Sequence, residues 1–229
     1  MFHLHRYKIV AVFLLFAAFA QAQEINPLYD RKPIRFGFGL MGNTAKLKFT
    51  PKTDVILSDT LQNIQSLNYP GFGLGGLVSF RLADNLDLKT MLNIQFAQRD
   101  MNYFFRSDVE KTAGIESTYM EIPLALKYKS KRHKNKRVYV HGGVTYRFDF
   151  TSDVETDRSD TKPIVALYPN TFSYDLGVGM DFYFEYFKFS PEIKISNGLG
   201  NQLVPDDFVF AGSLERVSPK LVQFCLIFQ

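Results

Sequence analysis

The chain has 229 residues, a hydrophobic content of 46% and 23 phenylalanines, and its formal net charge is only +4. A charge so close to zero argues against a nucleic-acid partner, and the single cysteine, Cys225, excludes an intramolecular disulfide. Beyond the amino terminus no apolar run approaches the length of a spanning helix, so the chain can cross a bilayer only as a closed β-barrel.

The amino terminus predicts a cleavable signal peptide over residues 1–22. Arg6 and Lys8 precede an apolar run at residues 9–20, which is too short to span a bilayer, and Ala20-Gln21-Ala22 places small residues at a cleavage site. The alternative is a short membrane anchor that is retained. Cleavage after Ala22 leaves a single domain, residues 23–229, with 25 basic and 23 acidic side chains.

The first predicted strands show apolar side chains at alternate positions. In the first strand, Phe36, Phe38 and Leu40 share one parity and glycine or polar residues share the other. Successive side chains of a strand point to opposite faces, so one face is apolar and the other polar. Two more strands follow around the tight turn Ala83-Asp84-Asn85. We expect these strands near residues 34–42, 70–82 and 86–102.

The same alternation continues to the end of the chain. It is clearest from Val138, where Val138, Val140 and Val144 alternate with Tyr139, His141 and Thr145. We expect the remaining strands near residues 117–129, 137–150, 172–184, 187–196 and 220–229. Long and short connections alternate between the strands, and long outer loops with short periplasmic turns are typical of outer-membrane barrels.

The sequence therefore predicts an all-β protein: an eight-stranded antiparallel transmembrane β-barrel, located in the cell outer membrane in contact with its lipid. A barrel of this size has a bore that side chains fill, so we do not expect an open pore. The inward parity collects charges of both signs: Arg35, Arg81, Asp87, Lys89, Arg99, Glu121, Lys127, Arg147, Asp149, Asp175, Asp181, Glu192 and Lys194. We interpret this lumen charge network as a structural ion-pair plug, with a proton or ion route as the alternative.

The densest charge run is the turn from Lys129 to Arg137. Lys131, Arg132, Lys134 and Lys136 form a candidate docking site for an acidic periplasmic partner or for inner-leaflet phosphates, and the alternative is a solvated hairpin tip.

Four further local expectations concern aromatic residues, prolines and one loop. Aromatic girdles are expected at both membrane surfaces. They comprise Tyr103 to Phe105, Tyr146 to Phe150, Phe172 and Tyr174 on the outer side, and Tyr128, Tyr139, Phe182 to Phe184, Tyr186 and Phe187 on the inner side. Pro123 and Pro191 fall within strands and predict β-bulges. Asp59 to Leu67 predicts a short helical turn over the barrel mouth.

No catalytic, cofactor or metal site is predicted. Two G-x-G-x-x-G patterns, from Gly37 and Gly71, lack the helix of a dinucleotide-binding unit, and glycines that make room for lumen side chains explain them better. The mature chain has only His133 and His141, too few for a metal cluster. We expect no small-molecule substrate; a barrel enzyme acting on lipid would require His141 for its activity.

Two segments, TYMEIPLALKYKS from Thr118 and the stretch from Ser173 to Asn201, resemble the PorT/SprT family of small outer-membrane barrels. The resemblance extends over the mature chain, although Gln229 displaces the aromatic residue that usually ends such a barrel. It implies a non-enzymatic component of type IX protein secretion and gliding motility, which acts through contacts with proteins of the export apparatus. The alternative is a general small envelope barrel, similar to OmpX, with a structural, ligand-binding or ion-passing role.

Overall fold

The computed structural model describes residues 29–51, 61–105, 110–151, 167–204 and 214–229; for residues 51, 61–68, 98–101, 103–105 and 110–116 it describes the backbone alone. A 3₁₀ turn, η1 (Tyr29–Arg31), precedes eight strands. They are β1 (Ile34–Pro51), β2 (Leu61–Ala83), β3 (Leu86–Phe105), β4 (Glu110–Lys129), β5 (Lys136–Asp149), β6 (Asn170–Tyr183), β7 (Lys188–Leu199) and β8 (Leu214–Phe228).

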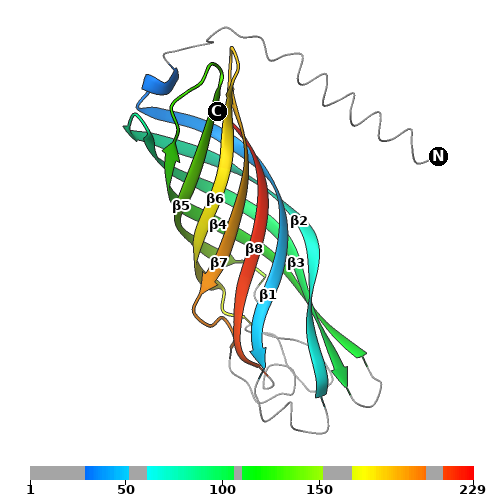
Figure 1. The fold of residues 1–229 in the computed structure, drawn as a ribbon. Helices are drawn as coiled ribbons and strands as arrows, with labels where there is room; N and C mark the ends of the chain where they lie inside the picture. Colours follow the sequence, from blue (N-terminus) through cyan, green and yellow to red (C-terminus); the bar gives the residue numbers. More distant parts are fainter. Residues whose placement is uncertain (1–28, 52–60, 106–109, 152–166, 205–213) are drawn as a thin grey trace, which may run out of the picture.

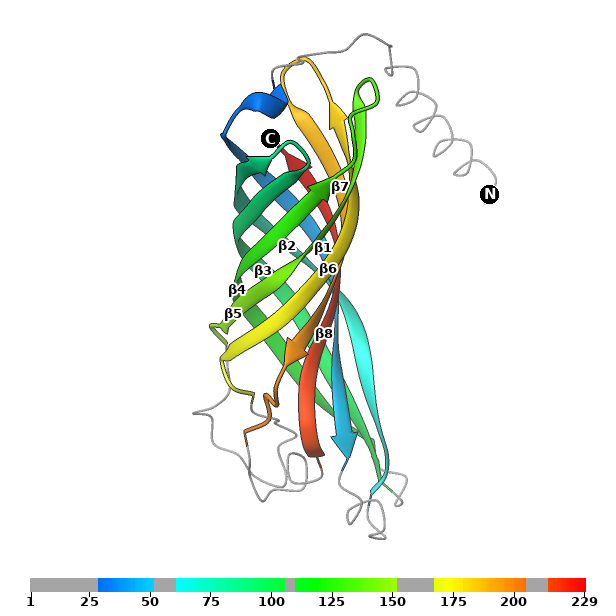
Figure 2. The same ribbon diagram turned by 60° about the vertical axis from the view of Figure 1, so that its left-hand side comes forward.

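The strands close into one antiparallel barrel in the order β1 to β8. Each strand pairs with its sequence neighbours, and β8 pairs with β1, as in Phe38 opposite Phe228. Figures 1 and 2 show the strands inclined to the barrel axis, with η1 and the carboxyl terminus at one end. Short turns lie at that end too, which assigns it to the periplasm. The predicted eight-stranded barrel is confirmed. No described helix has the length and apolar character needed to cross a membrane.

The strands extend farther at the opposite, outer end than the sequence pattern predicts. β1 continues to Pro51, and β8 begins at Leu214 instead of near residue 220. The predicted helical turn from Asp59 to Leu67 is wrong, because Leu61 onwards belongs to β2, where Leu67 lies opposite Asp100 of β3; Asp59 lies outside the described residues. A neighbouring strand supplies hydrogen-bond partners that an isolated helical propensity does not take into account.

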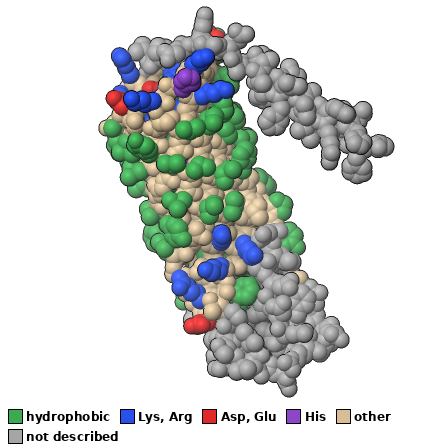
Figure 3. Space-filling model, in the orientation of Figure 1, with side chains coloured by type: hydrophobic (Ala, Val, Ile, Leu, Met, Phe, Trp, Pro, Cys, Tyr) green, Lys and Arg blue, Asp and Glu red, His purple; other side chains and the backbone are tan. Residues whose placement is uncertain are grey.

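The outward face of the barrel is an apolar belt in its middle. Its large apolar side chains include Phe36, Leu40, Phe72, Leu176 and Phe224, whose exposed fractions range from 49% to 71%. Figure 3 shows hydrophobic side chains (green) spread over the middle of the face in view. Soluble monomers rarely expose so large an apolar surface to water, and this surface matches the lipid-facing band of a transmembrane barrel.

Neither Pro123 nor Pro191 marks a bulge, contrary to the expectation. β4 keeps its register with β3 on both sides of Pro123, from Thr90 opposite Leu124 to Asn93 opposite Glu121. β7 likewise keeps its register with β6 around Pro191. Both prolines interrupt the ladder on one side without adding a residue. The register of β2 with β3 instead shifts between Asn68 and Phe72, beside Pro70.

Inward-facing glycines make room for large side chains from the next strand. Of the glycines in the two G-x-G-x-x-G patterns, Gly73 does so for the amide of Gln95, whereas a Cβ atom on Gly42 or Gly76 would meet open space, so the expectation is wrong for these two. A Cβ atom on Gly177 would collide with the imidazole of His141, and one on Gly179 would collide with the ring of Tyr139. The rings of β5 therefore lie across the backbone of β6. This close approach fills the bore, so the glycines serve the packing of the lumen.

The interior changes character along the barrel axis. Within the apolar belt it is mainly charged and polar, with one buried apolar cluster of Met41, Leu77, Met91, Cys225 and Ile227. Towards the outer end it is apolar. There Ala45, Leu47, Val217 and Leu221 are at most 4% exposed, and Leu214 is buried beside them. At the same level the outward positions of β1 and β8 carry Lys46, Lys48 and Lys220, which are exposed. At the outer end the inward face of the wall is therefore apolar and its outward face is charged, the reverse of the arrangement at membrane level.

Candidate functional site in the barrel lumen

Most of the predicted lumen charge network is buried inside the barrel. The buried members are Arg35, Asp87, Lys89, Glu121, Lys127, Arg147, Asp175, Asp181, Glu192 and Lys194. Arg81 is an exception, because its partly exposed guanidinium pairs with Asp84 in the β2–β3 turn. Asp149 is half-buried at the end of β5 and accepts hydrogen bonds from Thr151. The side chain of Arg99 lies outside the described residues.

The central carboxylate is Glu192 of β7. Lys89 Nζ lies 2.8 and 2.6 Å from its two oxygens, the Tyr139 hydroxyl donates to it at 2.9 Å, and His141 Nε2 lies 3.1 Å away. The three partners come from β3 and β5, so the contacts cross the bore. Glu192 is 2% exposed, and a buried carboxylate is tolerated only when such partners surround it.

Asp181 forms a second centre, one layer towards the periplasm. Lys127 Nζ lies 2.8 and 3.0 Å from its oxygens, Ser190 donates to it at 2.6 Å, and Lys188 Nζ lies 4.0 Å away. Lys127 also lies 3.5 Å from the ring centroid of Tyr139. That ring contacts both centres and separates Asp181 from Glu192.

The periplasmic end contains a third and a fourth carboxylate centre. Asp87 pairs with Arg35 and Lys129, each at 2.6 Å. Asp30 of η1 accepts a hydrogen bond from Tyr183 at 2.8 Å and one from Arg137 at 3.4 Å. Sequence reasoning missed Asp30, Lys129, Arg137 and Lys188, because these residues lie at or beyond the ends of the expected strands. For Lys129, Arg137 and Lys188 the signal is the continued inward parity of β4, β5 and β7, whereas Asp30 lies in η1 and has no strand parity.

Tyr29 of η1 completes the seal at the periplasmic mouth. Its ring meets Tyr183 edge-on at a centroid distance of 5.9 Å, and Lys188 Nζ lies 5.6 Å from the Tyr29 centroid. Burial raises the pKa of Tyr29 to about 12, so its phenol stays protonated at neutral pH. The segment before β1 therefore covers this end of the bore.

Towards the outer side, Glu121 and Asp175 form the last charged layer. Arg147 Nε lies 2.5 Å from Glu121, and Lys194 Nζ lies 3.7 Å from Glu121 and 3.4 Å from Asp175. The amides of Gln95 and Gln223 donate to Glu121 at 3.3 and 3.2 Å. Glu121 of β4 and Arg147 of β5, which the strand register places opposite each other, are thus in direct contact.

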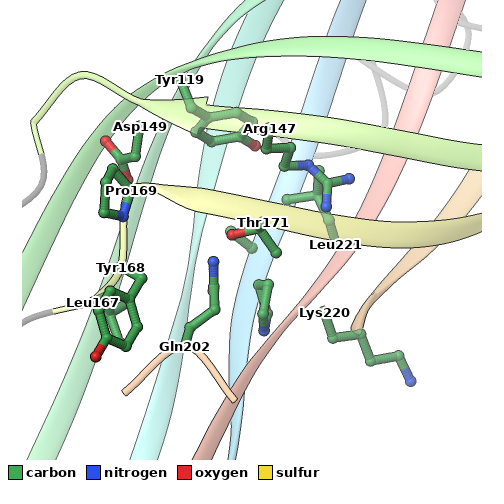
Figure 4. Close-up of a pocket in the computed structure, with 12 residues that line it drawn as sticks. Tyr119, Arg147, Asp149, Leu167, Tyr168, Pro169, Thr171, Gln202, Lys220 and Leu221 are labelled. Atoms are coloured by element: carbon green, nitrogen blue, oxygen red, sulfur yellow. The ribbon is translucent and has the colours of Figure 1, made fainter. Parts of the chain in front are cut away.

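The remaining space inside the bore is small. A cavity of about 10 Å³ lies between the Glu192 and Asp175 layers, where Asn93 is buried without a hydrogen-bond partner in the described part of the chain. A second cavity, of about 30 Å³, lies at the outer mouth beneath Leu167 and Gln202 (Figure 4). Volumes of this size hold about one or two water molecules, which is too little for a hydrated solute.

Two aromatic assignments to the inner girdle are wrong. Tyr139 and Tyr183 are each 3% exposed and point into the bore, where their hydroxyls donate to Glu192 and Asp30. Their odd positions follow the inward parity of β5 and β6, which outweighs the general preference of tyrosine for membrane surfaces. Tyr128, Tyr186 and Phe187 are exposed at that end.

The two histidines and the basic turn differ in their surroundings. His133 is exposed in the turn between β4 and β5, whereas His141 lies in the lumen beside Glu192. In the described residues no group of His, Cys, Asp and Glu could hold a metal ion. Within the turn, Lys131, Lys134 and Lys136 are exposed. Arg132 instead stacks 3.9 Å from the Tyr183 ring centroid.

Comparison with known proteins identifies the type of barrel. Residues 19–204 match the family model described as outer membrane protein beta-barrel domain. OprG from Pseudomonas aeruginosa is 13% identical with a TM-score of 0.46, and covers 85% of this chain and 90% of its own. The neisserial surface protein NspA is 8% identical with a TM-score of 0.45, and covers 86% and 98%. No curated protein matches the chain significantly.

Proposed function

Because the chain belongs to the outer membrane protein beta-barrel domain family, we propose that it works in the outer membrane through its surfaces, as a closed and non-enzymatic barrel. The observation that carries this proposal is the filled lumen. Four layers of buried carboxylates, around Asp87, Asp181, Glu192 and the pair Glu121 and Asp175, are each neutralised by cations from other strands. A bore closed in this way leaves the protein's outer surfaces for its function.

The specific role that we propose is in type IX protein secretion and gliding motility, in assembly or operation of the export apparatus. Its support is the resemblance of the β4 segment and of the β6–β7 hairpin to the PorT/SprT barrels. A barrel fold alone does not define a function, since one fold carries many functions. The closed bore agrees with a role through protein contacts, because no secreted protein could pass through it.

The deciding experiment is deletion of the gene in its own organism, followed by complementation. We expect the deletion strain to lose its secreted proteins from the medium and to lose surface motility, and we expect the wild-type gene to restore both. A complementing gene with the double variant Lys89→Met/Glu192→Leu, which removes both charges of the pair, should also restore secretion if the lumen is only structural. An unchanged secretome and unchanged motility in the deletion strain would refute the secretion role and leave a general envelope barrel.

Within the secretion role, the basic turn is the proposed docking site for an acidic partner. The variant Lys131→Glu/Lys134→Glu/Lys136→Glu reverses its exposed charges, and Arg132 is left unchanged because it contacts Tyr183. We expect weaker co-purification of partner proteins, with an equal amount of barrel in the membrane. Full recovery of the same partners with the variant would rule out this docking site.

The second candidate function, passage of protons or small ions, rests on the chain of charged layers along the bore. Planar-bilayer recordings of the purified barrel test it. Discrete ohmic openings that change on Glu192→Gln would favour it, whereas a barrel that shows no channel openings supports the closed lumen.

The proposed cleavage after Ala22 is tested by sequencing the amino terminus of protein isolated from outer membranes, which should begin at Gln23.

A further inference from the structure

The outer end of the seam between β1 and β8 carries a basic patch on the outside of the barrel. We define the outer basic patch as Lys46 and Lys48 of β1 with Arg216 and Lys220 of β8, all exposed. Figure 3 shows Lys and Arg side chains gathered just beyond the apolar band on this face. We propose that this patch binds the phosphate groups of a glycolipid in the outer leaflet.

The first argument is the register of the two strands. Lys46 lies directly opposite Lys220, and Thr50 lies opposite Arg216. Side chains directly opposite each other in an antiparallel pair have their Cβ atoms about 5 Å apart, and like charges there are destabilising. In the resolved parts of the barrel none of the three lysines has a carboxylate within ion-pair distance. An anionic ligand would relieve the repulsion between these charges.

The second argument comes from the other face of the same wall. Directly behind the patch the interior is apolar, with Ala45, Leu47, Val217 and Leu221 at most 4% exposed. In the membrane-level part, cations are neutralised by carboxylates across the bore, but among the described residues no carboxylate lies behind Lys46 or Lys220. In Figure 4 the Lys220 side chain extends away from the interior, towards the surroundings of the barrel.

The third argument is the position of the patch relative to lipid. Along β8 the outward residues Phe224 and Val222 are about half exposed within the apolar belt, and Lys220 is the next outward residue. One outward step along a tilted strand rises by only about 5 Å, so the Lys220 ammonium lies at headgroup height. Lysine there can keep its stem on the apolar surface and its charge among phosphates.

The neighbouring polar groups suit a phosphate ligand rather than a cation. Asn197 of β7 lies opposite Lys220, and Ser218 lies opposite Lys48, so neutral hydrogen-bonding side chains flank the lysines. Arg216 contacts the carbonyl oxygen of Gly200 at 3.4 Å. Glu215 precedes it at the far end of the strand, beyond the three lysines. The site is therefore centred on Lys46, Lys48 and Lys220.

The test compares two triple variants of the full barrel in detergent micelles. Lys46→Gln/Lys48→Gln/Lys220→Gln removes three charges from the patch, and the control Arg31→Gln/Lys32→Gln/Arg81→Gln removes three from the periplasmic end, outside the basic turn. The probes are bisphosphorylated lipid A, the same lipid A after enzymatic dephosphorylation, and inorganic phosphate. Heat-resistant electrophoretic mobility establishes that each variant is folded.

We expect the patch variant to bind phosphorylated lipid A about a hundredfold more weakly than wild type, since each lysine contributes about fivefold near anionic headgroups. The periplasmic-end variant should bind as wild type does, and dephosphorylated lipid A should bind wild type as weakly as the patch variant. Equal binding of phosphorylated lipid A by wild type and patch variant would overturn the proposal. Binding of inorganic phosphate as tightly as the lipid would overturn it too.

Discussion

The membrane-level barrel and its outer extension use the same alternating strands in opposite ways. At membrane level, Leu40 faces lipid while Glu192 and its partners fill the bore; farther out on the same strand β1, Lys48 faces outward while Leu47 is buried. An apolar face always turns towards the less polar surroundings, which are lipid in one region and the protein interior in the other. An alternating pattern thus indicates that one face of a strand is apolar and the other polar, but it does not determine which face points into the barrel.

The largest expected effect breaks the membrane-level side of this comparison. Glu192→Leu leaves the Lys89 ammonium buried and unpaired, which should destabilise the barrel by about 3–5 kcal/mol. Urea unfolding in lipid vesicles measures it, with Glu185→Leu in the exposed β6–β7 turn as the control. The double variant Lys89→Met/Glu192→Leu should recover much of the loss. Wild-type stability of Glu192→Leu would show that the ion pairs do not support the lumen.

The next effect tests the apolar interior of the outer extension. Leu47 is 1% exposed, so Leu47→Ala should leave a cavity and cost about 3 kcal/mol. Lys48→Ala, one residue along and on the outer face, should change stability by less than about 0.5 kcal/mol. Hydrogen exchange at the outer end of β1 and urea unfolding provide the readouts. Similar values for the two variants would mean that the extension has no packed interior.

A third effect locates the level at which the two regions meet. Leu40 lies opposite Leu226 within the lipid belt, whereas Thr44 lies opposite Val222 at its edge. Leu40→Lys should cost about 2 kcal/mol or more, and Thr44→Lys should cost about 0–1 kcal/mol, because the penalty of a charge falls towards the membrane surface. Unfolding in vesicles measures both. Equal penalties would place the membrane boundary elsewhere on β1.

The smallest effect concerns the periplasmic end. Asp30→Asn weakens the contacts of η1 with Arg137 and Tyr183 and should cost about 1 kcal/mol, because Asp30 is mostly buried. Asp84→Asn is the matched control: its carboxylate pairs with Arg81 but its side chain is 86% exposed, so its loss should be close to zero. Faster proteolysis of the segment before β1 in Asp30→Asn, but not in Asp84→Asn, would support this prediction. Equal proteolysis rates for the two variants would contradict it.

Sequence alone was sufficient for the barrel and for most of its lumen. The period of two placed Glu121, Asp181 and Glu192 inside because no other face of a lipid-exposed strand can hold a carboxylate. The same period also points inward for Tyr139, and in the structure this parity outweighs the general preference of tyrosine for membrane surfaces. Which cation meets which carboxylate depends on strand register and on the tilt of the strands, and a single sequence contains neither.

The outer extension was hardly predictable. Its strands reverse the pattern that defines the membrane-level strands, so β1 was expected to end near residue 42 and β8 to begin near residue 220. Residues 61–67 resemble a helical turn when considered alone, and only pairing with β3 makes them a strand. Pro123 and Pro191 each interrupt one ladder without shifting the register. Whether a proline causes a bulge depends on which neighbouring strand would have accepted a hydrogen bond from the backbone N–H that proline lacks.

Spin-label accessibility along β1 tests the exchange of faces most directly. Single cysteines replace Phe36, Phe38, Leu40, Thr44, Lys46 and Lys48 in a Cys225→Ala background, and the labelled barrel is inserted in vesicles. We predict that oxygen dissolved in the lipid reaches the first three labels, that a water-soluble nickel chelate reaches the labels at Lys46 and Lys48, and that the two curves cross near Thr44. Oxygen dominance at Lys46 and Lys48 would contradict the account.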